Sequence, residues 1–355
     1  MAISMPSDVT VRSNVELAVD ETDFHIFAYE RGWTDGLPVI PPTPERVEAM
    51  IAASGRDPLE VLGIMPPAQG ITTVHSVAVN AVMAGCSPAH FPVVVAAVRA
   101  VLDERFNLYG VQATTQAVAP MLMVNGPIVQ QLDFNGGHNC FGPKSRANAV
   151  VGRALRLCLL NIGGAIPGET DMSTHGQPGK YGVCFAENEA ASPWDPFHVE
   201  HGFSADTSCV TAFQVGSIAS MLDFGSTCAE ELLLMIADIM SANHSNNMQV
   251  GGGDLLVVMS PEHVGILERE NVTKDQVKRF LHQNARKPAS QIPSGVLGCI
   301  RDWRREALPI IGPETPIPVV DEWQWINIAV AGGAAGSHSL FLPGFGDGWA
   351  VTVAI

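Results

Sequence analysis

Three short runs of apolar residues predict buried β-strands at 121–124, 254–259 and 326–330. Each run is almost continuously apolar, which is typical of a strand whose two faces are both covered. Turn or cap residues follow the runs, namely Asn125-Gly126-Pro127, Ser260-Pro261 and Gly332-Gly333. Because helical patterns lie between the runs, we expect an α/β fold with a mixed sheet, flanking helices and glycine-rich loops at the strand ends.

Capping residues mark the starts of several helices. Thr43 with Pro44 and Ser87 with Pro88 combine an N-cap residue with a first-turn proline, whereas Thr227 with Glu230 and Thr273 with Gln276 have the spacing of a capping box. These signals predict helices at 45–54, 93–102, about 228–241 and 274–285.

The length of 355 residues suggests two domains or one large one. The stretch 163–196 is rich in glycine, proline and polar residues, as a connection between domains often is. We therefore predict an N-terminal α/β part at 1–165 and a C-terminal α/β part at 166–355, with one large domain as the alternative.

The net charge and the low content of charged residues indicate which kinds of partner this protein can bind. The chain has a formal net charge of −16, and charged residues make up only 16% of it, while 46% are hydrophobic. A protein that binds nucleic acid needs a basic face, so we expect no nucleic-acid partner. So few charges leave little polar material for a surface, which predicts an apolar subunit interface and a homo-oligomer.

The segment 1–20 has no cationic stretch followed by an apolar run, and no stretch of 18 uninterrupted apolar residues occurs in the chain. We therefore expect a cytoplasmic protein without a membrane partner. The seven cysteines contain no CxxC pair, which fits reduced thiols and neither a disulfide framework nor a zinc ribbon.

The richest segment for chemistry is 135–156, a glycine-rich loop followed by a predicted helix that begins at Arg146. A helix amino terminus attracts anions, and Lys144 and Arg146 add two full charges to it. We therefore expect this segment to bind a small anionic substrate. Asn148 and Arg153 on the helix, and Asn125 at a strand end, complete the candidate substrate-binding residues.

Cys140 lies in the same loop and is a candidate nucleophile. Cations and a helix amino terminus lower the pKa of a thiol, which increases its reactive thiolate fraction. His138, two residues before it, is a second catalytic candidate. The alternatives are that Cys140 is a small buried hydrophobic residue and that His138 hydrogen-bonds the backbone.

Glu187 follows a strand-like run at 181–186 and continues one of its apolar faces. A carboxyl group in apolar surroundings has a raised pKa and can serve as a general acid or base near neutrality. The alternative is a salt bridge to Arg146 or Arg153. His338, after a glycine-rich strand exit, is a further candidate for proton transfer or for an orienting hydrogen bond.

The sequence predicts no cofactor for this thiolate or carboxylate mechanism. A site for a divalent metal ion is the rival interpretation. His198 and His201 are three residues apart, the spacing of two ligands on one helical turn. With His138 and a carboxylate, they could hold a divalent metal ion. Trp194-Asp195-Pro196 before them favours an irregular loop, in which this spacing has no meaning.

Four blocks of the chain resemble blocks of an uncharacterised bacterial protein family. They are GWTDGLPV at 32–39, RANAVVGRALR at 146–156, PGKY at 178–181 and GAAGSHS at 333–339. The resemblance implies a bacterial cytoplasmic origin, and it implies no activity, cofactor or catalytic residue.

These observations predict an enzyme of hydrolase or lyase type that acts on a small anionic or amide-bearing metabolite. Cys140 or Glu187 would be its reactive group. No GxxxxGK[ST], GxGxxG, GxSxG or HExxH motif occurs, which lowers the odds for nucleotide-dependent enzymes, α/β-hydrolases and zincins. Two alternatives stay open: a mononuclear metal-dependent enzyme, and a non-catalytic subunit or binding protein of a larger redox complex.

Overall fold

The computed structural model describes residues 23–242, 245–334 and 336–355 of the chain. Residues 1–20, on which the expectation of no secretory signal rests, lie outside the described residues. Along the described part of the chain, no helix is long and apolar enough to cross a membrane.

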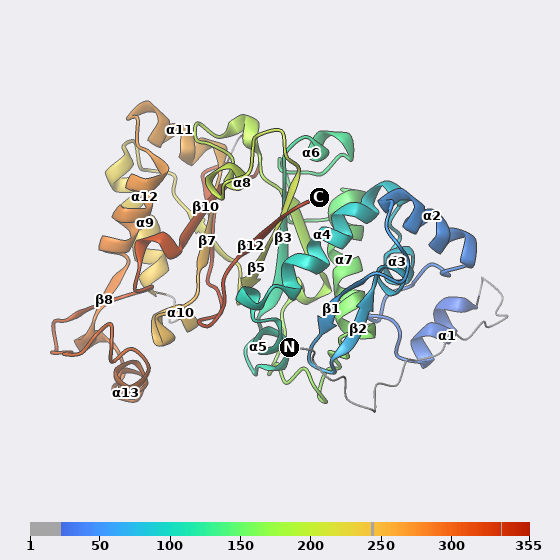
Figure 1. Cartoon of the computed structure of the whole chain (residues 1–355). Coiled ribbons are helices and arrows are strands. Elements are labelled where there is room, and N and C mark those ends of the chain that lie inside the picture. The colour runs from blue at the N-terminus through green and yellow to red at the C-terminus, as the bar shows by residue number, and fades with distance from the viewer. Residues whose placement is uncertain (1–22, 243–244, 335) are drawn as a thin grey trace, which may run out of the picture.

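Two four-stranded mixed sheets lie face to face at the centre of the molecule (Figure 1). The first has the order β12-β5-β3-β4 and contains β3 (Ala119–Asn125), β4 (Val183–Ala186), β5 (Cys209–Val215) and β12 (Val351–Ala354). The second has the order β10-β7-β11-β6 and contains β6 (Ala219–Leu222), β7 (Leu255–Met259), β10 (Ile326–Val330) and β11 (His338–Leu342). Two antiparallel pairs are separate: β1 (Val61–Met65) with β2 (Gly70–Thr73), and β8 (Arg286–Pro288) with β9 (Pro316–Pro318).

Helices cover the outer faces of both sheets (Figure 1). On the first sheet lie α4 (Phe91–Leu102) and α7 (Arg146–Asn161), with α3 (Val74–Ala84) packed on the outside of α7, and on the second lie α9 (Ala229–Ala242) and α12 (Lys274–Asn284). The other helices are α1 (Phe24–Glu30), α2 (Pro44–Ser54), α5 (Leu108–Ala113), α6 (Ile128–Gln131), α8 (Phe197–Glu200), α10 (Asn246–Val250), α11 (Pro261–Arg269) and α13 (Ser294–Trp303). The molecule is thus built in four layers, helices, sheet, sheet and helices.

Side-chain alternation along the strands explains the four layers. Leu122 and Val124 of β3 face the helices of the first sheet, whereas Met121 and Met123 face the second sheet. There they share one central core with Val258 of β7. Both faces of each central strand are therefore buried, which is why these strands are continuously apolar in sequence.

The predicted α/β class is confirmed, because each large sheet contains parallel and antiparallel pairs and helices flank both. The apolar run 326–330 coincides with β10, and 121–124 lies within β3. Glycines follow strands as predicted, with Gly126 after β3 and Gly332 after β10, both at positive φ. The sequence did not indicate that the strands form two sheets that pack on each other.

The predicted helix starts are largely confirmed. The Thr273 and Gln276 capping box forms at α12, and Ser87 forms a capping box with His90. At α9 the backbone N–H of Thr227 donates to the Glu231 carboxylate, one residue beyond the predicted partner Glu230.

The division into parts at 1–165 and 166–355 stays a prediction. The first sheet takes β3 from the earlier part and β4, β5 and β12 from the later one. The last strand of the chain therefore pairs within the sheet that begins at residue 119.

Asp254 immediately precedes β7 and is a buried acid. Its Oδ2 accepts hydrogen bonds from Nδ2 of Asn327 at 2.9 Å and from the Ala350 N–H at 2.7 Å. Burial outweighs these bonds and raises the pKa of Asp254 to about 7. The folded chain therefore keeps a proton on Asp254 at pH values where the unfolded chain has released it.

We predict that Asp254→Asn removes part of the pH dependence of stability. Between the ordinary pKa of 3.8 and about 7, the extra proton makes the free energy of unfolding fall as pH rises. The slope for one proton is about 1.4 kcal/mol per pH unit. Urea denaturation at a series of pH values should give a smaller slope for the variant, and a higher stability than wild type above this range. Equal slopes for both proteins would contradict the prediction.

Candidate functional site

The parallel pairing of β3 with β4 brings two polar residues together at the carboxyl ends of the strands. Val124 is the register partner of Ala186, and the N–H of Glu187 donates to the Val124 carbonyl at 3.1 Å. The next residues in each chain segment are Asn125 and Glu187. Sequence reasoning placed both at strand ends, and the structure places them side by side.

One amide group bridges two carboxylates at this point. Nδ2 of Asn125 donates to Oε2 of Glu187 at 2.6 Å and to Oε1 of Glu189 at 2.9 Å. Backbone N–H groups hold the same two oxygens, from Phe197 to Glu187 at 2.7 Å and from Gly126 to Glu189 at 2.7 Å. Each carboxylate is thus fixed by an amide and a main-chain donor.

The two carboxylates differ in their exposure to water. Glu187 is 2% exposed, whereas the side chain of Glu189 is 29% exposed. Burial raises the pKa of Glu187, and the neighbouring Glu189 charge adds to that effect. The Lys274 ammonium and the hydrogen bonds from Phe197 and Asn125 act in the opposite direction without cancelling the rise. The pair therefore combines a buried carboxyl group with a raised pKa and a second carboxyl group that water reaches.

His198 completes this polar cluster. It is fully buried, and its Nδ1 lies 3.9 Å from Oε1 of Glu189. Both of its ring nitrogens, Oδ1 of Asn125 and Oε1 of Glu187 lack a hydrogen-bond partner among the described residues. Buried polar atoms are rarely left unpaired, so four of them in one cluster indicate a place for a ligand or for ordered water.

Loops from the second sheet close over the same end. The N–H of Asn188 donates to the Val330 carbonyl at 2.7 Å, and the N–H of Gly332 donates to the Gly136 carbonyl at 2.8 Å. The carboxyl ends of β4 and β10 are therefore tied together. His138 lies against Gly333, where any Cβ would overlap its imidazole ring. Glycine at 333 thus lets the loop that carries His138 approach β10.

Cys140 is not acidified by cations as the sequence suggested. It is 5% exposed and belongs to the central core, and burial raises its pKa to about 11 despite nearby N–H groups of Phe141 and Gly332. Arg146 points elsewhere and donates from Nη2 to the Gly85 carbonyl at 3.1 Å. Desolvation therefore keeps this thiol protonated near neutrality, because burial disfavours its charged form.

The remaining substrate-binding candidates have other partners or lie on the surface. Asn148 holds the glycine-rich loop in place, because its Nδ2 donates hydrogen bonds to the carbonyls of Asn135 and Cys140 at 2.9 and 3.1 Å. Arg153 makes a bidentate ion pair with Asp35, with both distances 2.8 Å. Lys144 is exposed. Asn125 is therefore the predicted substrate ligand that the structure brings to the two carboxylates.

The salt bridge considered for Glu187 is wrong in both of its forms. Arg153 pairs with Asp35, and Arg146 bonds to the Gly85 carbonyl. The interpretation of Glu187 as a buried carboxyl group with a raised pKa agrees with the structure. His338 is exposed and lies edge-on to the ring of Phe224 at 6.1 Å.

The metal ligands considered from the sequence do not converge. His201 bonds through Nδ1 to the Phe197 carbonyl at 2.8 Å and stacks on the Phe197 ring. His198 points to Glu189, while His138 lies against Gly333. In the parts of the chain that the structure describes, no group of three or more His, Cys, Asp and Glu residues is arranged to hold a metal ion.

Comparison with known proteins found no match to any family model, to any curated protein or to any solved structure.

Sequence reasoning missed Glu189, although a signal for it exists. A second glutamate follows Glu187 after a single residue, at the end of a predicted strand. Alternation would place both glutamates on one side of an extended chain. Only the structure shows that Asn125, 64 residues earlier, reaches both carboxylates.

We predict that Cys228 and Cys299 react with iodoacetamide before Cys140 at neutral pH. The first two are partly exposed, whereas Cys140 is buried and its raised pKa leaves little thiolate. Peptide mass spectrometry over a time course gives the order of labelling. In Cys140→Ser, the other two thiols should be labelled at unchanged rates. Preferential labelling of Cys140 in the wild type would return the thiolate mechanism to consideration.

Proposed function

We propose that this protein is an enzyme that hydrolyses a small amide-bearing metabolite, with Glu187 as general acid and Glu189 as general base. The observation that carries the proposal is the pair of carboxylates bridged by Nδ2 of Asn125. Their different burial suits the two roles, since a buried carboxyl group retains a proton to donate and an exposed carboxylate can accept one from water.

Glu187 and Glu189 together supply both proton transfers that amide hydrolysis requires. Glu189 accepts a proton from a water molecule, and the water oxygen forms a bond to the carbonyl carbon of the amide. Glu187 gives its proton to the amide nitrogen as the carbon–nitrogen bond breaks, so that an acid and an amine or ammonia are released. One carboxyl group gains a proton and the other loses one, and exchange with solvent restores both.

The unpaired atoms of the cluster support an amide-bearing substrate over an anionic one. Oδ1 of Asn125 is an acceptor, and the two nitrogens of His198 provide one donor and one acceptor in the neutral ring. An amide group offers a complementary N–H and carbonyl. A negatively charged group placed here would be repelled by a carboxylate, which disfavours the anionic substrate at this end of the sheet.

Elimination is the second reaction type that two carboxylates can perform. Glu189 would then take a proton from carbon in place of water, and Glu187 would protonate the departing group. The partial exposure of Glu189 favours hydrolysis, because water reaches it. Analysis of the products separates the two, since elimination leaves a carbon–carbon double bond and consumes no water.

The test compares the wild type with Glu187→Gln and Glu189→Gln on a panel of small amides, with released ammonia or amine as the readout. We expect either substitution to lower turnover by at least about a hundredfold, because it removes a proton-transfer group. Glu187→Gln should keep or raise the melting temperature, since glutamine preserves the acceptor and removes a buried ionisable group. Wild-type activity should decline as pH rises through the raised pKa of Glu187.

Glu268→Gln is the matched control, because Glu268 is an exposed glutamate of α11 and should leave turnover unchanged. Full activity of Glu187→Gln would exclude its role as the acid. A wild type that binds but turns over no member of the panel would favour the non-catalytic binding protein.

We also propose that the enzyme is a cytoplasmic homo-oligomer. Large apolar side chains are exposed on and beside β1, namely Leu59, Val61, Ile64 and Tyr109. Exposed apolar groups of this kind mark subunit interfaces. Light scattering at micromolar protein concentration should return a multiple of the 37.7 kDa chain mass, and a monomer mass would contradict the proposal.

A further inference from the structure

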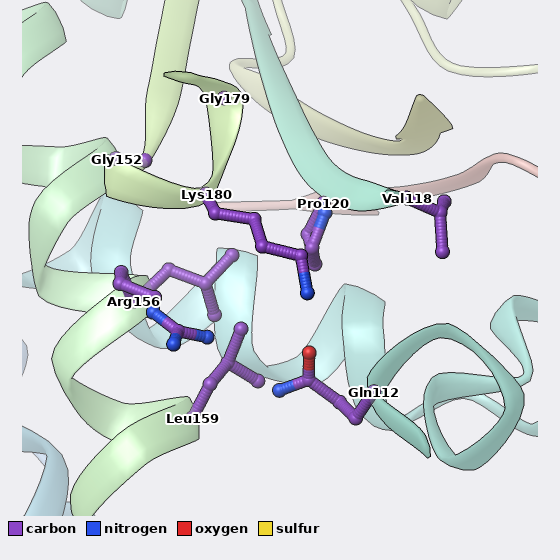
Figure 2. Close-up of a pocket in the computed structure, with 10 residues that line it drawn as sticks. Gln112, Val118, Pro120, Gly152, Arg156, Leu159, Gly179 and Lys180 are labelled. Carbon is purple, nitrogen blue, oxygen red and sulfur yellow. The ribbon is translucent and has the colours of Figure 1, made fainter. Parts of the chain in front are cut away.

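A second polar site lies at the other end of β3 and β4. A pocket there is bounded by Val118 and Pro120 at the start of β3, by Gly182 just before β4, and by one side of α7. Figure 2 shows the guanidinium of Arg156, the ammonium of Lys180 and the amide of Gln112 pointing toward the same space. Two cationic groups and an amide therefore face a pocket of an otherwise acidic protein.

Close contact between two glycines makes this pocket. Gly152 of α7 lies so near the loop before β4 that a Cβ on it would be 2.8 Å from the Gly182 carbonyl oxygen. A Cβ on Gly182, which has a φ of +99°, would likewise overlap the backbone of Gly152. The two glycines let the 3₁₀ turn Pro178–Tyr181 sit on α7, which brings Lys180 to Arg156.

Arg156 is the cationic group of this pocket that has no directly bonded partner among the described residues. Lys180 is paired with Asp171 at 2.6 Å, and Arg153, one turn before Arg156, is paired with Asp35 at 2.8 Å. Among the described residues, the half-buried guanidinium of Arg156 makes no hydrogen bond and no ion pair. Burial lowers the pKa of Arg156, and the charges of Asp171 and Asp35, which form no ion pair with it, act in the opposite direction. The group thus has five N–H donors and no acceptor.

Gln112 is a second, independent sign of a missing partner. Its side chain is 1% exposed, and its Nε2 has no hydrogen-bond acceptor among the described residues. A buried donor without an acceptor is unfavourable in a folded protein. Nε2 and the guanidinium both donate, so the partner that would satisfy both is an acceptor with several oxygen atoms.

We propose that this pocket binds a small oxyanion, a carboxylate or phosphate group, held by Arg156, Lys180 and Gln112. Charge supports one negative group, since Lys180 and Arg153 each form an ion pair with an aspartate, whereas Arg156 forms none among the described residues. Size limits the ligand: the cavity volume is about 10 Å³, the space of about one water molecule, so one oxygen of the anion enters it and the rest of the ligand lies in the part of the pocket that is open to solvent. The planar guanidinium fits the oxygens of a carboxylate or phosphate in pairs.

This site is separate from the carboxylate pair at the other end of the strands and does not depend on the proposed hydrolysis. An anion bound here joins α7 to the loop before β4, and so stabilises the folded chain by mass action.

The test is thermal unfolding of the whole protein with sodium phosphate or sodium acetate, against sodium chloride of equal ionic strength. We expect at least one of the two oxyanions to raise the wild-type melting temperature above the chloride value. The anion that acts identifies the group, phosphate or carboxylate. Arg156→Met should weaken the binding by about tenfold to a hundredfold, since it removes charge-assisted hydrogen bonds.

Arg153→Met is the matched control on the same helix. It leaves the Asp35 carboxylate buried without its partner, so its melting temperature should fall while its response to the oxyanion remains. Arg156→Met without added anion should melt at or above the wild-type temperature, because Arg156 has no partner to lose. Gln112→Leu should also fold and bind the anion more weakly.

Three results would overturn the proposal. The first is a wild type that neither oxyanion stabilises more than chloride does. The second is an Arg156→Met protein that responds to the anion as the wild type does. The third is a loss of stability in Arg156→Met as large as in Arg153→Met, which would make Arg156 a structural residue.

Discussion

The parallel pairing of β3 with β4 is the interaction on which both polar sites depend. At the carboxyl ends it places Glu187 beside Asn125, and at the amino ends it places the loop with Lys180 over α7. Strand β3, which separates the two polar sites, spans seven residues, about 20 Å of extended chain. Two carboxyl groups lie at one end, and Arg156 and Lys180 lie at the other. At that distance, salt screens most of the attraction between them.

The two packed sheets explain why the polar groups lie at strand ends. Both faces of β3 are buried, one under helices and one under the second sheet, so a charged side chain within the strand would lose its water. Strand ends are the nearest positions at which main-chain N–H groups become free to bond side chains. Gly126, directly after β3, uses its N–H to hold Glu189, and Phe197, the first residue of α8, holds Glu187 in the same way. The layered core thus determines where chemistry can occur.

Local signals predicted much of the fold. The run 326–330 and the capping box of Thr273 depend on neighbouring residues alone, and both appear in the structure where the sequence places them. Asn125 and Glu187 were identifiable because each follows an apolar run. The packing of one sheet on the other was not identifiable, because a continuous apolar strand has the same pattern under helices as under a sheet.

The sequence by itself determined the strands, the helix starts and the polar residues that follow the strands, since these depend on propensity, periodicity and capping. The tertiary structure decided which polar groups meet and whether they are charged. Cys140 is an example of a group whose charge depends on the tertiary structure. Lys144 and Arg146, close to it in sequence, suggested a reactive thiol, whereas burial raises the pKa of Cys140 to about 11. Arg146 and Arg156 lie on one helix, yet only Arg156 faces the pocket. Desolvation and helix orientation depend on contacts between distant segments, and no local pattern encodes them.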